Sequence, residues 1–273
     1  MYISSIPSPV CRLEALVRAE DQLKAAPGDI FFGTPDSMAT AILVDGAFFL
    51  RRFKHCFPDH DRDDPVSVAH GLGMLAYWHL VQRLGPNNVQ KLVSENNLLA
   101  ESRDFYRIFF YDCPPLSKRM HTPLGRKSVD FGKSPEAQFR KRLHKEVLKL
   151  RKVALRLGRL NETSKWRLTE SATSRLIKDP ASFQPTDDDF EIDTKQKGVD
   201  MRLGLDVASL SFKGQVDQIV IVAADADYVP AAKLARREGI DVILDRMGDH
   251  RAAPDLLEHV DALRDCYMPR PSQ

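Results

Sequence analysis

Residues 218–227 read Gln-Ile-Val-Ile-Val-Ala-Ala-Asp-Ala-Asp, an apolar run that ends in two acids. A second run of this kind, Ala41-Ile-Leu-Val-Asp45, leads directly into Gly46. Short, continuously apolar runs are typical of strands that are buried on both faces of a parallel sheet. We therefore expect both runs to be central strands, each with acidic side chains at its carboxyl end.

Strand and helix patterns alternate along the rest of the chain. Tyr106–Tyr111 is a further expected strand, followed by Asp112 and stopped by Pro114-Pro115. In the last third we expect a helix at 199–211, a strand at 218–223, a helix at 230–238, a strand at 240–244 and a helix at 254–265. Such alternation indicates βαβ units. The predicted fold is α/β, a Rossmann-like arrangement of three layers around a central, mostly parallel sheet.

Residues 136–157 are expected to form one long basic helix. Phe139, Leu143 and Val147 begin an apolar stripe whose steps of three and four residues continue to Leu157. From Arg126 to Arg167 the chain has fourteen Lys or Arg against four acids, whereas the whole chain is nearly balanced at 40 against 38. A basic block fits either a polyanionic partner such as nucleic acid or a solvated helix face. We predict that this helix is an insertion between sheet strands.

Composition excludes several classes of protein. The chain has 273 residues, of which 43% are hydrophobic and 29% are charged, so a disordered chain or a coiled-coil rod is not expected. It has neither a run of about 18 apolar residues nor a secretory signal, so neither a membrane span nor export is predicted. The cysteines are widely spaced, which favours a reducing, cytoplasmic location over a zinc site or a disulfide framework. They are Cys11, Cys56, Cys113 and Cys266.

One domain is expected over residues 38–268, with the insertion at about 113–190. Residues 1–37 contain many Pro and Gly and form an N-terminal extension, and residues 269–273 form a short tail. Because Met38 comes immediately before the first strand, we hypothesise that Met38 is the native start and that the extension is not native.

The acids are expected to gather at one edge of the sheet. Ligands of open parallel sheets bind beyond the carboxyl ends of the strands. Asp45, Asp225 and Asp227 follow strands, and Asp200 opens a helix. Clustered carboxylates repel one another unless a cation lies between them, and Mg²⁺ or Mn²⁺ prefers oxygen ligands. Such an ion can activate a water and neutralise a phosphate, so the pattern indicates phosphodiester hydrolysis.

Each acid also has a structural explanation. Asp45-Gly46 fits a simple turn, and Asp225 fits a helix cap. Asp112, before Cys113-Pro114, fits turn chemistry better than metal binding. Asp206 is six residues after Asp200, about 120° round a helix, so we assign it a structural role.

Four stretches, in this order, resemble NYN-domain proteins of the LabA-like branch of the PIN-like nuclease superfamily. They are Ala41–Phe49, Phe109–Pro115, Gln196–Met201 and Ile221–Pro230. The resemblance spans about Met38 to Leu263 and implies a PIN-like sheet, acids that bind Mg²⁺ or Mn²⁺, and ribonuclease or RNA-processing activity. By motif, the family's acids match Asp45, Asp200, Asp225 and Asp227, and Asp112 matches a further position that is kept as an additional candidate.

The last motif departs from the family pattern. Where Ser-Gly-Asp-Ser-Asp-Phe is usual, this chain has Ala223-Ala-Asp-Ala-Asp-Tyr228. Both acids remain, but a serine hydroxyl that positions ligands is lost and the glycine is replaced, which predicts a stiffer loop and a lower rate.

We predict a metal-dependent ribonuclease. The catalytic residues, which are also the metal ligands, are Asp45, Asp200, Asp225 and Asp227, with Mg²⁺ or Mn²⁺ as cofactor. RNA is the expected partner, and the residues expected to contact its phosphates are Lys197, Arg142, Lys145, Lys149 and Lys152. Lys197 fits a solvated lysine equally well. Tyr111, Trp166 and Tyr228 are candidates for stacking on bases, although a core role is the better expectation for Trp166.

Two other functions fit the sequence less well. The alanines around Asp225 favour a catalytically degenerate RNA-binding or regulatory module. A phosphatase of the haloacid-dehalogenase type also places aspartates at strand ends, but it needs a second Asp two residues after the first, and position 47 is Ala. We rank the phosphatase last.

Overall fold

The computed structural model describes residues 39–84, 104–160, 165–194, 196–249 and 251–265. All of these residues belong to one compact unit. The expectations for residues 1–37, for the tail at 269–273 and for Cys11 and Cys266 lie outside the described residues. Among the described helices, none is both long and apolar enough to cross a membrane.

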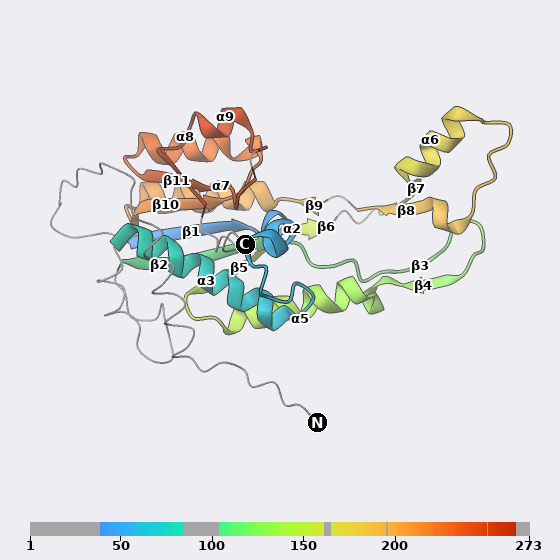
Figure 1. The fold of residues 1–273 in the computed structure, drawn as a ribbon, viewed down its shortest axis with the longest axis horizontal. Coiled ribbons are helices and arrows are strands. Elements are labelled where there is room, and N and C mark those ends of the chain that lie inside the picture. Colours follow the sequence, from blue (N-terminus) through green and yellow to red (C-terminus); the bar gives the residue numbers. More distant parts are fainter. Residues whose placement is uncertain (1–38, 85–103, 161–164, 195, 250, 266–273) are drawn as a thin grey trace, which may run out of the picture. The chain divides into compact units, whose positions relative to one another are not determined.

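A six-stranded parallel sheet forms the centre of this unit (Figure 1). The strand order is β12-β11-β10-β1-β2-β5. The bounds are Ala39–Asp45 for β1, Phe105–Asp112 for β2, Val153–Leu157 for β5, Val216–Val222 for β10, Asp241–Asp245 for β11 and Ala262–Arg264 for β12. The two continuously apolar runs predicted to be central strands are thus the central pair, with Leu43 opposite Ile221 and Val44 opposite Val222. The predicted α/β fold with a central parallel sheet is confirmed.

Helices cover both faces of the sheet, which gives three layers. One face packs against α2 (Gly46–Cys56), α3 (Pro65–Leu84) and α5 (Pro135–Lys149). The other face packs against α7 (Val199–Phe212), α8 (Val229–Arg237) and α9 (Pro254–Leu257). Along β1, Ile42 and Val44 point into the first core, whereas Ala41 and Leu43 point into the second. This alternation of faces explains why the strand is apolar at every position.

The structure corrects the expected helix at 136–157. α5 ends at Lys149, and the chain turns through Lys152 (φ 57°) into β5, which pairs with β2. The spacing of apolar residues fits a strand as well as a helical stripe at Val153, Leu155 and Leu157. The segment is a strand because it pairs with β2. The helix expected at 254–265 is corrected in the same way, because α9 ends at Leu257 and β12 follows.

The basic helix α5 is therefore the crossover between two neighbouring strands of the sheet, β2 and β5. Other parts of the region 113–190 form small elements outside the main sheet. They are the antiparallel pairs β3 (Arg119–His121) with β4 (Ser128–Asp130) and β7 (Lys165–Leu168) with β8 (Phe190–Asp193), the helix α6 (Glu170–Lys178), and the 3-10 helices η1 (Phe131–Lys133) and η2 (Asp187–Asp189). The two strand pairs are joined by a bond from Trp166 Nε1 to the carbonyl of His121, at 2.9 Å.

Gly46 allows the chain to turn tightly from β1 into α2. A Cβ at this position would lie 2.6 Å from the carbonyl oxygen of Tyr111 and 2.9 Å from the ring of Phe110, both in the neighbouring strand β2. Because backbone is one of the two neighbours, the clash is not relieved by a side-chain rotation. The glycine therefore fixes where α2 begins and, with it, the position of Asp45.

We expect Gly46→Ala to lower the free energy of unfolding by about 1–3 kcal/mol, because it overpacks a filled core. Urea unfolding measures this change. Gly204→Ala is the matched control. Gly204 lies in the middle of α7, and apart from the backbone of its own helix no atom lies within 4 Å of an added Cβ, so the change should stabilise the helix by up to about 1 kcal/mol. Equal effects of the two substitutions would contradict the assigned contact.

Candidate active site

The hydroxyl of Tyr228 lies between two of the predicted carboxylates. Its oxygen is 3.0 Å from Asp45 Oδ2 and 3.0 Å from Asp200 Oδ1. Tyr228 closes the 3-10 helix η3 (Ala226–Tyr228) and is only 1% exposed. Burial, together with the two carboxylates, raises the pKa of its phenol, so the proton stays on the ring oxygen. A phenol has one proton, so it cannot donate to both carboxylates at once.

Asp45 combines a structural and an electrostatic role. It follows β1 and caps α2, with Oδ1 accepting from the backbone N–H of Phe48 at 3.1 Å, while Oδ2 faces Tyr228. Burial raises the pKa of Asp45, and the nearby charge of Asp200 adds to the rise, although the hydrogen bonds from Phe48 and Tyr228 oppose it. The site therefore favours a proton or a cation beside this carboxylate.

Asp200 reaches the same phenol from another element. Lys197 ends the short strand β9 (Gln196–Lys197), which pairs with β6 (Arg159–Leu160). Gly198 follows with φ 78°, a left-handed conformation that favours glycine, and the chain then enters α7. Asp200 lies in the first turn of α7, where the N-terminal end of the helix favours a negative charge.

The structure does not bring all four predicted acids to one point. Asp225 caps η3 by accepting from the backbone N–H of Asp227 at 3.2 Å, and both side chains are exposed. They share one short segment with Tyr228. Within the part of the chain that the structure describes, no group of three or more His, Cys, Asp or Glu side chains is arranged to hold a metal ion.

The donors still fit a divalent cation by their chemistry. Asp45 and Asp200 offer carboxylate oxygens on either side of a single phenolic proton. Oxygen donors with excess negative charge suit Mg²⁺ or Mn²⁺ and not softer metals. Asp225 and Asp227 add two exposed carboxylates on the segment that carries Tyr228.

Asp112 has its own partners. It is 1% exposed and accepts a hydrogen bond from the guanidinium of Arg140 and one from His144 Nε2 at 2.8 Å, both on α5. Burial acts to raise the pKa of Asp112, but the bonds from His144 and Arg140 outweigh it and hold the pKa below its usual range. This carboxylate therefore ties α5 to the end of β2. The sequence signal for the pair was the i, i+4 spacing of Arg140 and His144, which puts both on one helix face.

The basic residues predicted to bind RNA lie in three places. Arg142, Lys145 and Lys149 are exposed on α5, and Lys149 Nζ pairs with Glu146 at 2.8 Å. Lys152 lies beyond the helix and donates to the carbonyl of Phe105 at 2.6 Å, so its placement on the basic helix is wrong. Lys197, next to Gly198 and the start of α7, has an exposed side chain.

Two of the aromatic side chains expected to stack on bases are buried. Tyr111 is 0% exposed and donates to Asp206 Oδ2 at 2.8 Å, and Arg156 Nε binds the same oxygen at 3.0 Å. With Tyr228 buried as well, neither ring has a face for a base, and the prediction is wrong for both. Trp166 is half-buried and packs near Phe131, with ring centroids 6.0 Å apart.

Residues 141–263 match the model of the NYN domain. This segment is similar to an NYN domain. It contains Asp200, Asp225 and Asp227, whereas Asp45 comes earlier in the chain, on a strand that pairs with β10 inside the matched segment. The match confirms the predicted NYN resemblance over these residues. The LabA-like branch stays a prediction.

Other comparisons add little. No curated protein matches the chain. A crystal structure of a protein of unknown function from Vibrio parahaemolyticus is similar over 86% of this chain and 99% of that chain, with 12% sequence identity and a TM-score of 0.38.

We expect Asp45→Asn to stabilise the metal-free protein at neutral pH. The raised pKa means that the folded state binds this proton more tightly than the unfolded state. The protonated Asp45 of wild type therefore contributes its full stabilisation below the pKa of the unfolded state, about 4. This stabilisation is lost as pH rises through the pKa of the folded state. Asn keeps the helix cap without the charge, so the variant should be more stable than wild type at pH 7, by an amount that shrinks on acidification.

Urea unfolding in EDTA between pH 5 and 8 measures this effect. Asp227→Asn is the control, because Asp227 is exposed in the segment that follows β10. Its free energy of unfolding should stay within about 0.5 kcal/mol of wild type. Destabilisation by Asp45→Asn at pH 7 would show that the ionised Asp45 carboxylate stabilises the folded protein, which would contradict its raised pKa.

Proposed function

We propose that this chain is a divalent-metal-dependent nuclease that hydrolyses phosphodiester bonds in RNA. The observation that carries the proposal is the Tyr228 hydroxyl held between Asp45 and Asp200. Two carboxylates with only the hydroxyl proton of Tyr228 between them favour a bound cation. They lie next to the start of α7, in the segment that matches the NYN domain.

Each residue has a distinct role in this proposal. Asp45 and Asp200 hold Mg²⁺ or Mn²⁺, and Asp225 and Asp227 are the additional ligands. The bound ion supplies Lewis acidity, which lowers the pKa of water and neutralises charge on a phosphate. Tyr228 orients the two carboxylates through its hydroxyl, and its burial holds that hydroxyl in one position.

The exposed face of α5 supplies the RNA contacts. Arg142, Lys145 and Lys149 are exposed there, and Lys197 lies close in sequence to Asp200. Contacts of Lys and Arg to phosphates give affinity and position the strand but carry little sequence information. The choice of RNA over DNA rests on the family resemblance and is the first property to test.

A degenerate RNA-binding module is the second candidate. The alanines at 223, 224 and 226 remove polar groups around Asp225, and the described residues contain no group of three potential ligands. Such a protein would bind RNA with or without metal and would not cut it.

We expect metal-dependent cleavage of RNA that requires Asp45 and Asp200. The assay is digestion of a mixed pool of labelled RNA and DNA with Mg²⁺, with Mn²⁺ and with EDTA. Asp45→Asn or Asp200→Asn should lower the rate by about 100-fold or more, since loss of even an outer-shell partner of a metal costs 10–100-fold. Asp188→Asn, at an exposed position in η2, is the control and should cleave like wild type.

If the protein binds RNA but does not cleave it with any metal, the nuclease proposal is contradicted and the degenerate RNA-binding module is supported. Cleavage that survives both aspartate substitutions would place the active site elsewhere.

We expect Arg142→Glu with Lys145→Glu to weaken RNA binding and flatten its salt dependence. Each lost contact to single-stranded RNA lowers the slope of log K against log salt by about 0.7, so two contacts lower it by about 1.4. Titrations of RNA at several KCl concentrations measure the slope. Lys213→Glu with Lys233→Glu makes the same charge change at exposed positions associated with α7 and α8, on the other face of the sheet. An equal effect of both pairs would mean that only net charge matters.

A further inference from the structure

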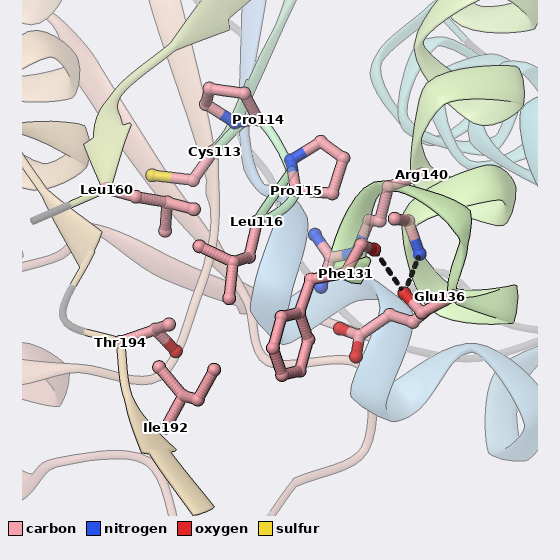
Figure 2. A pocket seen from close by; sticks show the side chains of 12 residues that line it. Cys113, Pro114, Pro115, Leu116, Phe131, Glu136, Arg140, Leu160, Ile192 and Thr194 are labelled. Carbon is pink, nitrogen blue, oxygen red and sulfur yellow. Dashed lines mark hydrogen bonds between the residues drawn. The ribbon is translucent and has the colours of Figure 1, made fainter. Parts of the chain in front are cut away.

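A cavity of about 210 Å³ opens where β2 ends (Figure 2). Its wall includes the segment from Cys113 to Leu116, the ring of Phe131, the first turns of α5 with Glu136 and Arg140, and Thr194 beyond β8. None of the residues predicted from the sequence to bind RNA lies in this wall.

The cavity is adjacent to the candidate active site. In the sheet, Asp45 lies opposite Tyr111, and Cys113 follows only two residues later on the same chain. Gly158 packs between Cys113 and the segment that leads into α7. A Cβ added at Gly158 would lie 2.9 Å from Cys113 Sγ, 2.9 Å from the carbonyl oxygen of Lys197 and 2.8 Å from Val199. The wall of the cavity is therefore in contact with the turn that positions Asp200.

The charge of the cavity does not suit a phosphate. Arg140 already binds the buried Asp112, so its positive charge is balanced. Glu136 adds a carboxylate to the same wall. An anion would meet a neutral ion pair and a negative charge, which disfavours the phosphate backbone of a nucleic acid.

The chemistry of the wall suits a group with apolar faces and polar edges. Pro114, Pro115 and Leu116 form one apolar side, and Figure 2 shows the Phe131 ring and Ile192 below them. Glu136 provides hydrogen-bond acceptors on the remaining side. A nucleobase has these properties: its faces stack on aromatic rings, and its edges carry N–H donors.

We propose that this cavity receives one unstacked nucleobase of the RNA substrate, placed against Phe131 with its edge towards Glu136. This inference rests on the proposed function, because it supplies a base subsite beside the carboxylates that act on the phosphate. The cavity then contributes affinity through stacking, whereas the basic face of α5 contributes it through charge.

The test measures binding of fluorescently labelled single-stranded RNA octamers in EDTA, where cleavage does not occur. Phe131→Ala removes the ring and should weaken binding by about 5- to 100-fold, the usual range for loss of one stacked base. Thr194→Trp fills the cavity from an exposed position and should weaken binding to a similar extent although it adds an aromatic ring. Phe212→Ala is the matched control, because Phe212 is 64% exposed on α7 and lies outside the cavity wall.

A second set of octamers, each with one abasic nucleotide, links the effect to a base. Wild type should lose affinity for the octamer whose abasic nucleotide falls at the subsite, and Phe131→Ala should show no further loss with that octamer. Thr194→Trp guards against a folding defect in Phe131→Ala, since it changes an exposed side chain.

The outcomes separate the two proposals. If wild type cleaves and binds RNA but both cavity variants bind all octamers like wild type, the base subsite is wrong and the nuclease proposal stands. If wild type neither binds nor cleaves RNA, both proposals fail. Selective loss in both cavity variants, with normal binding by Phe212→Ala, supports the subsite.

Discussion

One phenolic proton shared by two carboxylates is the constraint on which the site depends. Tyr228 lies 3.0 Å from an oxygen of Asp45 and 3.0 Å from an oxygen of Asp200, and it can donate to only one of them at a time. The parallel pairing of β1 with β10 brings these groups together, since Asp45 ends one strand and the Tyr228 segment follows the other. The fold thus sets the exposed carboxylate of Asp200 near that of Asp45, whose burial makes its own negative charge costly, and this favours a cation there.

Much of the fold was predictable because the central strands are buried on both faces. A continuously apolar run such as Ala41–Val44 has few alternatives to a central parallel strand. The outer strand β5 was not predictable, because Val153–Leu157 fits a helix as well as a strand, and its partner, β2, lies about 40 residues earlier in the chain. The crossover helix α5 consequently looked like part of an insertion.

The candidate site was predictable only at the level of residue type. The sequence pointed to Asp45 as an acid at a strand end and to Asp200 as an acid that opens a helix, but it gives no sign that the ring of Tyr228 is buried with its hydroxyl between them. We expected that tyrosine to stack on a base. The ion pair of Asp112 with Arg140 was missed for the same reason: burial and partner choice depend on contacts between segments far apart in the sequence.

The most direct test of this charge balance is calorimetric titration of Mn²⁺ into the metal-free protein in buffers of different ionisation enthalpy, between pH 5 and 8. If a cation replaces the proton that the Asp45 carboxyl binds because of its raised pKa, binding should release protons at the acidic end of this range and strengthen as pH rises. Asp45→Asn should remove both the proton release and most of the affinity. Binding that releases no proton at any pH, or that is unchanged in Asp45→Asn, would contradict a metal site built around the Tyr228 hydroxyl.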